Sequence, residues 1–178
     1  MKRLLLMAAA TVLVFNLGGR AEAAEAGDVV FHNATADITH LAGTEPVDQV
    51  DLMANFTNKE SESCESGDSP LNHGVMVTLQ QGLCGSAAPA VNLSVPSFRP
   101  LVKRSNVAKF EGKTLEGVTV DAVLTTLGTV PGTCGSWKLK VDAVNVDLWS
   151  INANPVAMTI TLADGSSGCL SINHAQIQ

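Results

Sequence analysis

The fold is decided first by residues 137–146, WKLKVDAVNV. Apolar residues occupy every second position in the first half of this stretch, and lysine or aspartate stands between them. Successive side chains of a β-strand point to opposite faces, so this alternation predicts a strand with one face in a core and the other in water. At Ala143-Val144 the apolar residues change phase, which is typical of a β-bulge.

Similar strand patterns extend outward from this stretch. Alternating apolar runs occur at residues 75–79, 91–95 and 118–124. Downstream, residues 156–162 lead into ADGSSG, whose Asp-Gly pair favours a turn, and residues 169–177 run back as the second arm of a hairpin. The mature chain shows no amphipathic helix of ten residues or more. We therefore predict an all-β fold, a single antiparallel β-sandwich or barrel-like domain over residues 24–178.

The first 23 residues, MKRLLLMAAATVLVFNLGGRAEA, have the three parts of a secretory signal peptide. Lys2 and Arg3 precede an apolar run of about 14 residues, and small residues around Ala23 provide a cleavage site. The run is shorter than the roughly 18 to 20 residues that a membrane-spanning helix needs. We expect cleavage after Ala23, no membrane insertion afterwards, and a periplasmic or extracellular location.

Charge and composition narrow the range of partners. The whole chain has a formal net charge of −6, and cleavage would leave eight basic and sixteen acidic residues. Nucleic acid and anionic lipid are poor partners for such a chain, because affinity for either depends mainly on lysine and arginine. Aromatic residues make up 4% of the chain, with no tyrosine, which disfavours a ligand face built from stacked rings.

The four cysteines all follow the predicted cleavage site: Cys64, Cys84, Cys134 and Cys169. An even number of cysteines in an exported chain predicts two disulfides. No pair has the C-x-x-C spacing of a redox or zinc motif. Four cysteines allow three pairings, and we favour Cys64 with Cys84 and Cys134 with Cys169, since each pair brackets strands that are close in sequence.

The C-terminal half resembles a known type of module. Residues 95–124, VPSFRPLVKRSNVAKFEGKTLEGVTVDAVL, contain a basic turn followed by Phe110-Glu111-Gly112, and residues 154–156, Asn-Pro-Val, begin a strand that ends in a Gly/Asp turn. In these features the chain is similar to an uncharacterised β-rich module of secreted bacterial proteins. The resemblance covers residues 91–178 and implies a fold but no activity.

Residues with catalytic or metal-binding chemistry are scattered. The histidines, at His32, His40, His73 and His174, have no metal-binding spacing, and there is no G-x-S-x-G or S-x-x-K motif. Three carboxylates lie close along a strand–turn–strand run and could in principle act as the paired acids of a glycosidase: Glu111, Glu116 and Asp121. Solvent-facing side chains are the favoured interpretation. We therefore predict no catalytic residue, no cofactor and no metal.

An acidic segment between two predicted strands carries oxygen ligands of the kind that calcium binds. Its carboxylates are Glu60, Glu62, Glu65 and Asp68, but they lack the register of an EF-hand loop. A solvated loop is the favoured interpretation, and a calcium-dependent adhesin is an alternative.

The leading functional prediction is a non-enzymatic exported protein, a structural or binding component whose partner is itself or a constituent of the cell surface or matrix. One alternative is a fimbrial or filament subunit in which residues 27–40 complete the sheet of a neighbouring copy by strand addition. Another is a hydrolase that uses the paired carboxylates.

Overall fold

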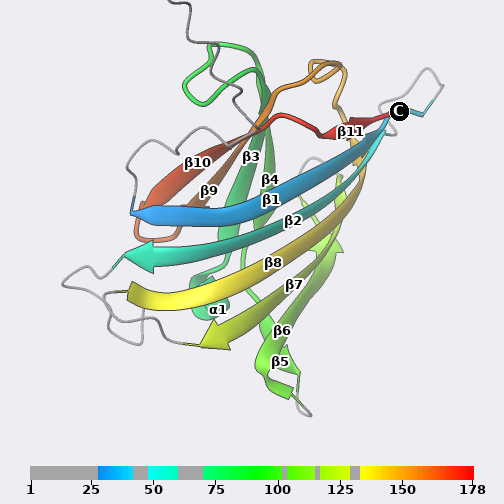
Figure 1. The fold of residues 1–178 in the computed structure, drawn as a ribbon. Coiled ribbons are helices and arrows are strands. Elements are labelled where there is room, and N and C mark those ends of the chain that lie inside the picture. The colour runs from blue at the N-terminus through cyan, green and yellow to red at the C-terminus, as the bar shows by residue number, and fades with distance from the viewer. Residues whose placement is uncertain (1–27, 42–47, 60–69, 102–103, 115–116, 129–132) are drawn as a thin grey trace, which may run out of the picture.

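The computed structural model describes residues 28–41, 48–59, 70–101, 104–114, 117–128 and 133–178. In these residues the chain is almost entirely β-strand, arranged in two sheets that pack face to face as a sandwich (Figure 1). The prediction of an all-β sandwich is confirmed. The predicted signal peptide at residues 1–23 lies outside the described residues.

The larger sheet has seven strands. Their order is β11 (Gln176–Ile177), β1 (Val29–Thr39), β2 (Asp48–Lys59), β8 (Thr133–Val146), β7 (Thr119–Gly128), β6 (Arg104–Lys113) and β5 (Arg99–Leu101). All neighbours are antiparallel except β11, which runs parallel to β1. The strand predicted from residues 137–146 lies within β8, near the middle of this sheet.

The smaller sheet has four strands. Their order is β10 (Ser167–Ile172), β9 (Val156–Leu162), β3 (Val75–Gln81) and β4 (Ala90–Val95). A single helical turn, α1 (Pro70–His73), precedes β3. Because β3 pairs with β9 and β2 pairs with β8, strands that are neighbours in space are far apart in sequence.

The core lies between the inner faces of the two sheets. Alternate residues of β2, such as Leu52 and Phe56, are buried there together with Leu79 of β3 and Ile160 of β9. Phe56 also packs against Phe31 of β1, with ring centroids 6.4 Å apart. The alternation that predicted the strands is therefore the alternation between core and solvent.

The predicted change of phase in β8 corresponds to a real bulge, but at a different residue. Asp48 of β2 pairs with Val146 and Gln49 pairs with Val144, so Asn145 is the extra residue, with φ 62°. Ala143 continues the buried face, whereas Val144 is exposed. Asparagine tolerates positive φ better than valine does, so the bulge falls on Asn145.

The predicted C-terminal hairpin is confirmed for its first part only. Residues 156–162 and 167–172 pair as β9 and β10 around the Asp164-Gly165 turn. The chain then leaves this sheet, and β11 joins the edge of the larger sheet beside β1. Asn154 supports this crossing, because its side chain both donates to Ala175 O and accepts from Ala175 N at 2.9 Å.

One alternative function has residues 27–40 as a strand donated to another copy. In the structure β1 is an interior strand of this chain's own larger sheet, between β2 and β11 (Figure 1). Its apolar residues Val29, Phe31 and Ile38 are buried in the chain's own core.

Candidate functional site

Five carboxylate side chains form a row across the outer face of the larger sheet. They are cross-strand partners on β1, β2, β8, β7 and β6, in the order Asp37, Asp51, Asp142, Asp121 and Glu111. Neighbouring strands lie about 4.8 Å apart, so each carboxylate has another carboxylate one strand away. Like charges placed directly opposite each other destabilise a sheet.

Two lysines offset part of this repulsion. Lys140 Nζ lies 2.9 Å from a carboxylate oxygen of Asp142. Lys109 Nζ lies 3.0 Å from Asp121 and also contacts Glu111. Hydrogen bonds to Glu111 and then Asp121 raise the pKa of Lys109, and a hydrogen bond to Asp142 raises that of Lys140. On β6, β7 and β8 the row of carboxylates is therefore paired with lysines from the neighbouring cross-strand row.

The pKa values of Asp51 and Asp142, at the centre of the row, are shifted in opposite directions. A hydrogen bond to Asp142, followed by burial, raises the pKa of Asp51 to about 6 from its ordinary value of 3.8. Burial tends to raise the pKa of Asp142 too, but hydrogen bonds from Asp51 and Lys140 outweigh it and leave that pKa below its ordinary value. Asp142 is thus the charged member of the pair, and Asp51 holds the proton below pH 6.

Replacing Asp51 with asparagine should stabilise the protein at neutral and alkaline pH. The native state holds the Asp51 proton more tightly than the unfolded chain does, so the wild type loses stability as pH rises from 3.8 to about 6 and stays lower above that. The amide of asparagine still donates to Asp142 at every pH. Solvent screens these half-buried groups, so the expected gain is on the order of 0.5 kcal/mol.

Urea unfolding at a series of pH values would measure this difference. The gap between Asp51→Asn and the wild type should grow between pH 4 and pH 6 and then level off. Asp37→Asn, at the end of the same row, is the matched control and should show little of this pH dependence, because Asp37 is the smallest of the contributions to the Asp51 pKa. A gap that does not change with pH would contradict the raised pKa of Asp51.

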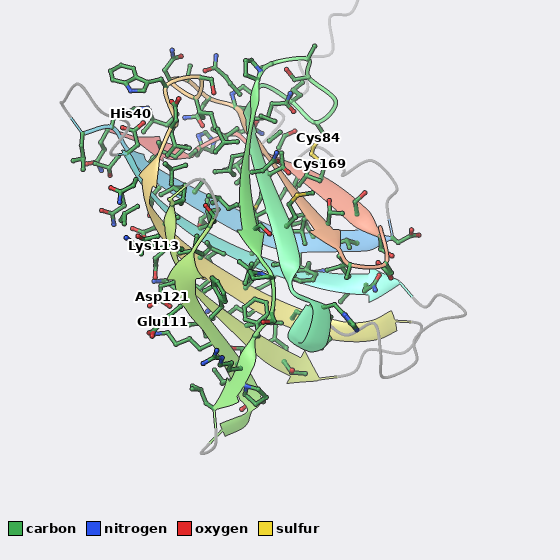
Figure 2. The ribbon with its side chains drawn as sticks, turned by 180° about the vertical axis from the view of Figure 1, so that it is seen from behind. His40, Cys84, Glu111, Lys113, Asp121 and Cys169 are labelled. Atoms are coloured by element: carbon green, nitrogen blue, oxygen red, sulfur yellow. A yellow bond between two sulfur atoms is a disulfide. The ribbon has the colours of Figure 1, made fainter. Side chains whose placement is uncertain are left out.

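The structure brings together two of the three carboxylates considered for a hydrolase. Glu111 and Asp121 are direct cross-strand partners, and Glu116 lies outside the described residues. Both side chains point outward from the outer face of the larger sheet (Figure 2). The acids of a glycosidase flank a bond held between them, whereas these two share Lys109 on an exposed surface.

The histidines and acids do not assemble into a metal centre in the described part of the chain. No group of three or more His, Cys, Asp or Glu residues there could hold a metal ion. His32 lies near the start of β1 and contacts Thr57 Oγ1 at 3.2 Å, whereas His40 directly follows the end of β1. The acidic segment with Glu60, Glu62, Glu65 and Asp68 lies outside the described residues.

Asp48 is a fully buried carboxylate that sequence analysis missed. It is 0% exposed and accepts hydrogen bonds from Leu41 N at 3.2 Å and Leu148 N at 3.1 Å, with His40 Nδ1 also at 3.1 Å. His40 Nε2 lies 3.0 Å from Ile151 O. The four contacts join the end of β1 and the start of β2 to the loop after β8. No local sequence signal marks Asp48, because its partners are distant in sequence.

The structure contains a disulfide between Cys84 and Cys169, so the predicted pairing of Cys64 with Cys84 and Cys134 with Cys169 is wrong (Figure 2). The predicted pairing assumed that cysteines close in sequence are close in space. Instead, β9 lies between β3 and β10 in the smaller sheet, and the loop after β3 folds back to reach β10.

The disulfide fastens the loop after β3, residues 82–89, to the smaller sheet. Gln80 Nε2 donates to Ser86 O at 2.8 Å and also to Ala88 O. Cys84 N donates to Ser171 Oγ of β10 at 3.1 Å. The loop is therefore held over one end of the sheet's outer face, and it leads directly into β4.

The outer face of the smaller sheet is uncharged over its whole described extent. Its cross-strand rows read Ser167, Thr161, Met76 and Ser94; then Cys169, Thr159, Thr78 and Asn92; then Ser171, Ala157, Gln80 and Ala90. Thr78 Oγ1 donates to Asn92 Oδ1 at 2.8 Å across β3 and β4. The two outer faces of the sandwich thus differ sharply, one carrying the carboxylate row and the other no charge.

Among the strands that the structure describes, three of the four sheet edges are protected from pairing with another strand. β11 has two residues, and β5 has three, with Pro100 among them and a register shift beside it. β10 is covered by β1, since Gly168 lies so close to it that a Cβ atom there would be 1.9 Å from Val29 O. Short strands, proline and coverage are the usual means of protecting an edge.

β4 is the exception. Within the part of the chain that the structure describes, it pairs with β3 on one side only, and its six residues, AVNLSV, include no charge, no proline and no bulge. Asn92 and Ser94 are exposed, whereas Leu93 and Val95 are buried. A regular, uncharged edge of this length presents unpaired N–H and C=O groups that are ready to bind another strand.

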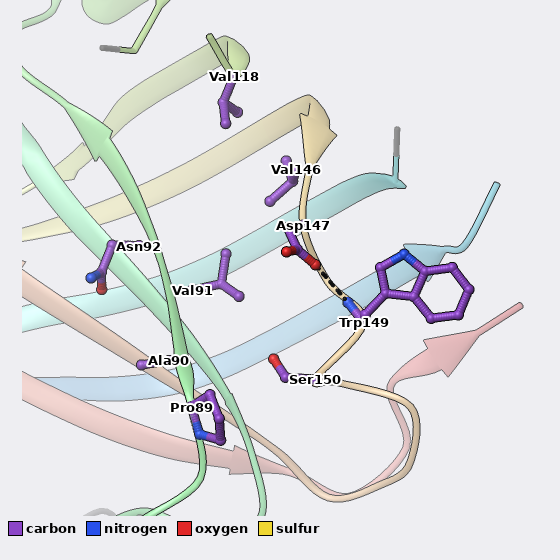
Figure 3. Close-up of a pocket in the computed structure, with 9 residues that line it drawn as sticks. All are labelled: Pro89, Ala90, Val91, Asn92, Val118, Val146, Asp147, Trp149 and Ser150. Carbon is purple, nitrogen blue, oxygen red and sulfur yellow. Dashed lines mark hydrogen bonds between the residues drawn. The ribbon is translucent and has the colours of Figure 1, made fainter. Parts of the chain in front are cut away.

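An open groove of about 570 Å³ lies beside this edge (Figure 3). Val91 of β4, Val118 before β7 and Val146 of β8 give it an apolar floor, and Asn92, Asp147 and Ser150 add polar groups. Trp149 lies at the rim, 61% exposed, and its indole points out toward His40, with ring centroids 5.9 Å apart. The groove lies between β4 and the larger sheet. We call β4 and this groove together the open side of the sandwich.

A scan of protein-family models, a search of curated proteins and a search of solved structures each found no match to this chain. Among the described residues, no helix is long and apolar enough to cross a membrane. The disulfide is consistent with an oxidising location. The strongest candidate site on geometric grounds is the open side of the sandwich, formed by β4 and the adjoining groove.

Proposed function

We propose that this protein is a non-enzymatic exported β-sandwich that acts as a structural or binding component, and that it engages its partner along the open side formed by β4 and the groove. One observation carries the proposal: β4 is an unprotected strand edge with an apolar groove next to it. An extended segment added to β4 would form main-chain hydrogen bonds and place alternate side chains in the groove.

The export part of the proposal is supported by the signal-peptide pattern of residues 1–23 and by the disulfide. The similarity to a β-rich module of secreted bacterial proteins is consistent with it. A hydrolase gains no comparable support, because Glu111 and Asp121 lie on the outer face of the larger sheet, where both contact Lys109. A donated β1 strand is also disfavoured, since β1 is committed to the core of its own chain.

We also propose a second disulfide, between Cys64 and Cys134. With Cys84 bonded to Cys169, these two are the pair that remains. Lys59 at the end of β2 pairs with Thr133 of β8, which directly precedes Cys134. Cys64 follows Lys59 by five residues, and such a segment can span up to about 17 Å, more than a disulfide requires.

Enlarging the side chain that points into the groove should abolish partner binding. We expect Val91→Trp to reduce retention of the labelled protein on the surface and matrix of the cells that export it by about tenfold or more, a loss of about 1.4 kcal/mol of binding free energy. The measurement is equilibrium binding of wild type and variant to washed cells and isolated matrix.

The matched control is Thr35→Trp, which adds the same ring to the outer face of β1, away from β4. It should bind as the wild type does. Thermal unfolding of both variants verifies that they are folded. Equal retention of Val91→Trp and wild type would reject the open side as the surface that binds cells or matrix.

A further inference from the structure

We propose that the partner of β4 is the β4 strand of a second copy of this chain, paired antiparallel about a two-fold axis that joins two four-stranded sheets into one of eight strands. This inference rests on the proposed function, because it assumes that the open side is the binding surface. It goes further by naming the occupant and the geometry of the contact.

The charge distribution favours a second copy as the occupant. The chain is acidic, with a net charge of −6, so most pairs of surfaces on two copies repel each other. β4 and the outer face of the smaller sheet carry no charged side chain in the described part of the chain. Two copies can therefore approach along β4 without bringing the carboxylate row of either one into contact.

The alternation of side chains on β4 restricts the register. Directly opposite residues of an antiparallel pair point to the same face of the sheet. Asn92 and Ser94 point outward and Leu93 points inward, so the two-fold axis must pass beside a residue and not between two residues. If it passes at Asn92, that residue faces its own copy; if it passes at Leu93, Asn92 faces Ser94.

Both registers keep the two faces of β4 matched. With the axis at Asn92, this residue faces its own copy and Ser94 faces Ala90, and with the axis at Leu93, Asn92 faces Ser94; in both registers Val91 faces an apolar residue, Leu93 or Val95. Pro89 precedes β4 and Pro96 follows it, which confines the pairing to about six residues. A contact of this size falls at the small end of protein interfaces, so the dimer should form reversibly with concentration.

Sedimentation equilibrium from micromolar to millimolar protein tests the proposal. We expect the wild type to show a monomer–dimer equilibrium and Asn92→Lys to weaken it by at least about tenfold, because a lysine on a strand edge places like charges across the two-fold axis. Met76→Lys is the matched control. Met76 is 39% exposed on the outer face of the adjacent strand β3, so the same charge there should leave an edge-to-edge dimer unchanged.

Amide hydrogen exchange of residues 90–95 provides a measurement that needs no variant. Half of the β4 amides should gain protection as the wild-type concentration rises, whereas the amides of β3 should not change. A wild type that remains monomeric at millimolar concentration would overturn the proposal. So would a dimer that Met76→Lys disrupts and Asn92→Lys does not, since the contact would then lie on the face of the sheet.

The two proposals can fail separately. If the wild type is monomeric but is retained on cells or matrix in a way that Val91→Trp abolishes, the open side binds a partner other than a second copy. If the wild type is monomeric and is not retained, both proposals are wrong. Unchanged thermal unfolding of Asn92→Lys ensures that loss of the dimer is not loss of the fold.

Discussion

Replacing Cys84 and Cys169 together with serine is expected to lower the free energy of unfolding by about 4 to 5 kcal/mol. The bond joins residues 85 apart in sequence, so it removes a large amount of conformational entropy from the unfolded chain. A loss of this size is a large fraction of the 5 to 15 kcal/mol that a typical domain has. Urea unfolding of wild type and variant, both oxidised, measures it.

The hydrogen bond between β10 and the loop after β3 provides a matched control for this experiment. Ser171→Ala removes the hydrogen bond between Ser171 Oγ and Cys84 N but keeps the covalent link, so it should cost only about 1 kcal/mol. A non-reducing peptide map of the wild type should show Cys84 joined to Cys169 and Cys64 joined to Cys134. If the double serine variant loses no more stability than Ser171→Ala does, the disulfide does not act through loop entropy.

Replacing Asp48 with alanine is expected to lower the free energy of unfolding by about 3 to 4 kcal/mol. The carboxylate is fully buried, and its removal leaves Leu148 N and Leu41 N without the acceptor that the fold provides. A buried donor without a partner costs about 1 to 3 kcal/mol, and loss of a charged acceptor costs more. Both ends of the β1–β2 connection would also lose their link to the loop after β8.

Asp48→Asn separates the loss of hydrogen bonds from the loss of charge. The amide oxygen can still accept from one or both main-chain N–H groups, so this variant should lose clearly less stability than Asp48→Ala. A double-mutant cycle with His40→Ala then measures the coupling between the His40 ring and the carboxylate, whose atoms are 3.1 Å apart. If Asp48→Ala unfolds at the same urea concentration as the wild type, the hydrogen bonds of Asp48 do not support the fold.

The strands could be predicted from the sequence because burial on one face imposes a period of two. The alternation at residues 75–79, 91–95 and 137–146 marks strands that the structure contains as β3, β4 and β8. The bulge in β8 was also predictable, although its position at Asn145 depended on the pairing with Asp48 and Gln49 in β2. A local pattern reports which side of a strand is buried but not which strand lies beside it.

The candidate site could be predicted only in its parts. Residues 91–95 were recognised as a strand, but nothing in them indicates that β4 lies at an edge. That position follows from the pairing of β3 with β9, whose residues are about 80 positions away along the chain. Likewise, Glu111 and Asp121 were noted as close in sequence, whereas Asp37, Asp51 and Asp142 join them only through the register of five strands.

The sequence was sufficient to predict the all-β class, the turn at Asp164-Gly165, and the buried and exposed faces of the strands at residues 75–79, 91–95, 118–124, 137–146 and 156–162. These properties depend on residues within a few positions of each other. Three features required the three-dimensional arrangement of the chain: the disulfide between Cys84 and Cys169, the departure of β11 from the hairpin and, among the described strands, the unprotected edge at β4. Each of these depends on which distant segments pair, and that choice is made by packing two sheets around one core.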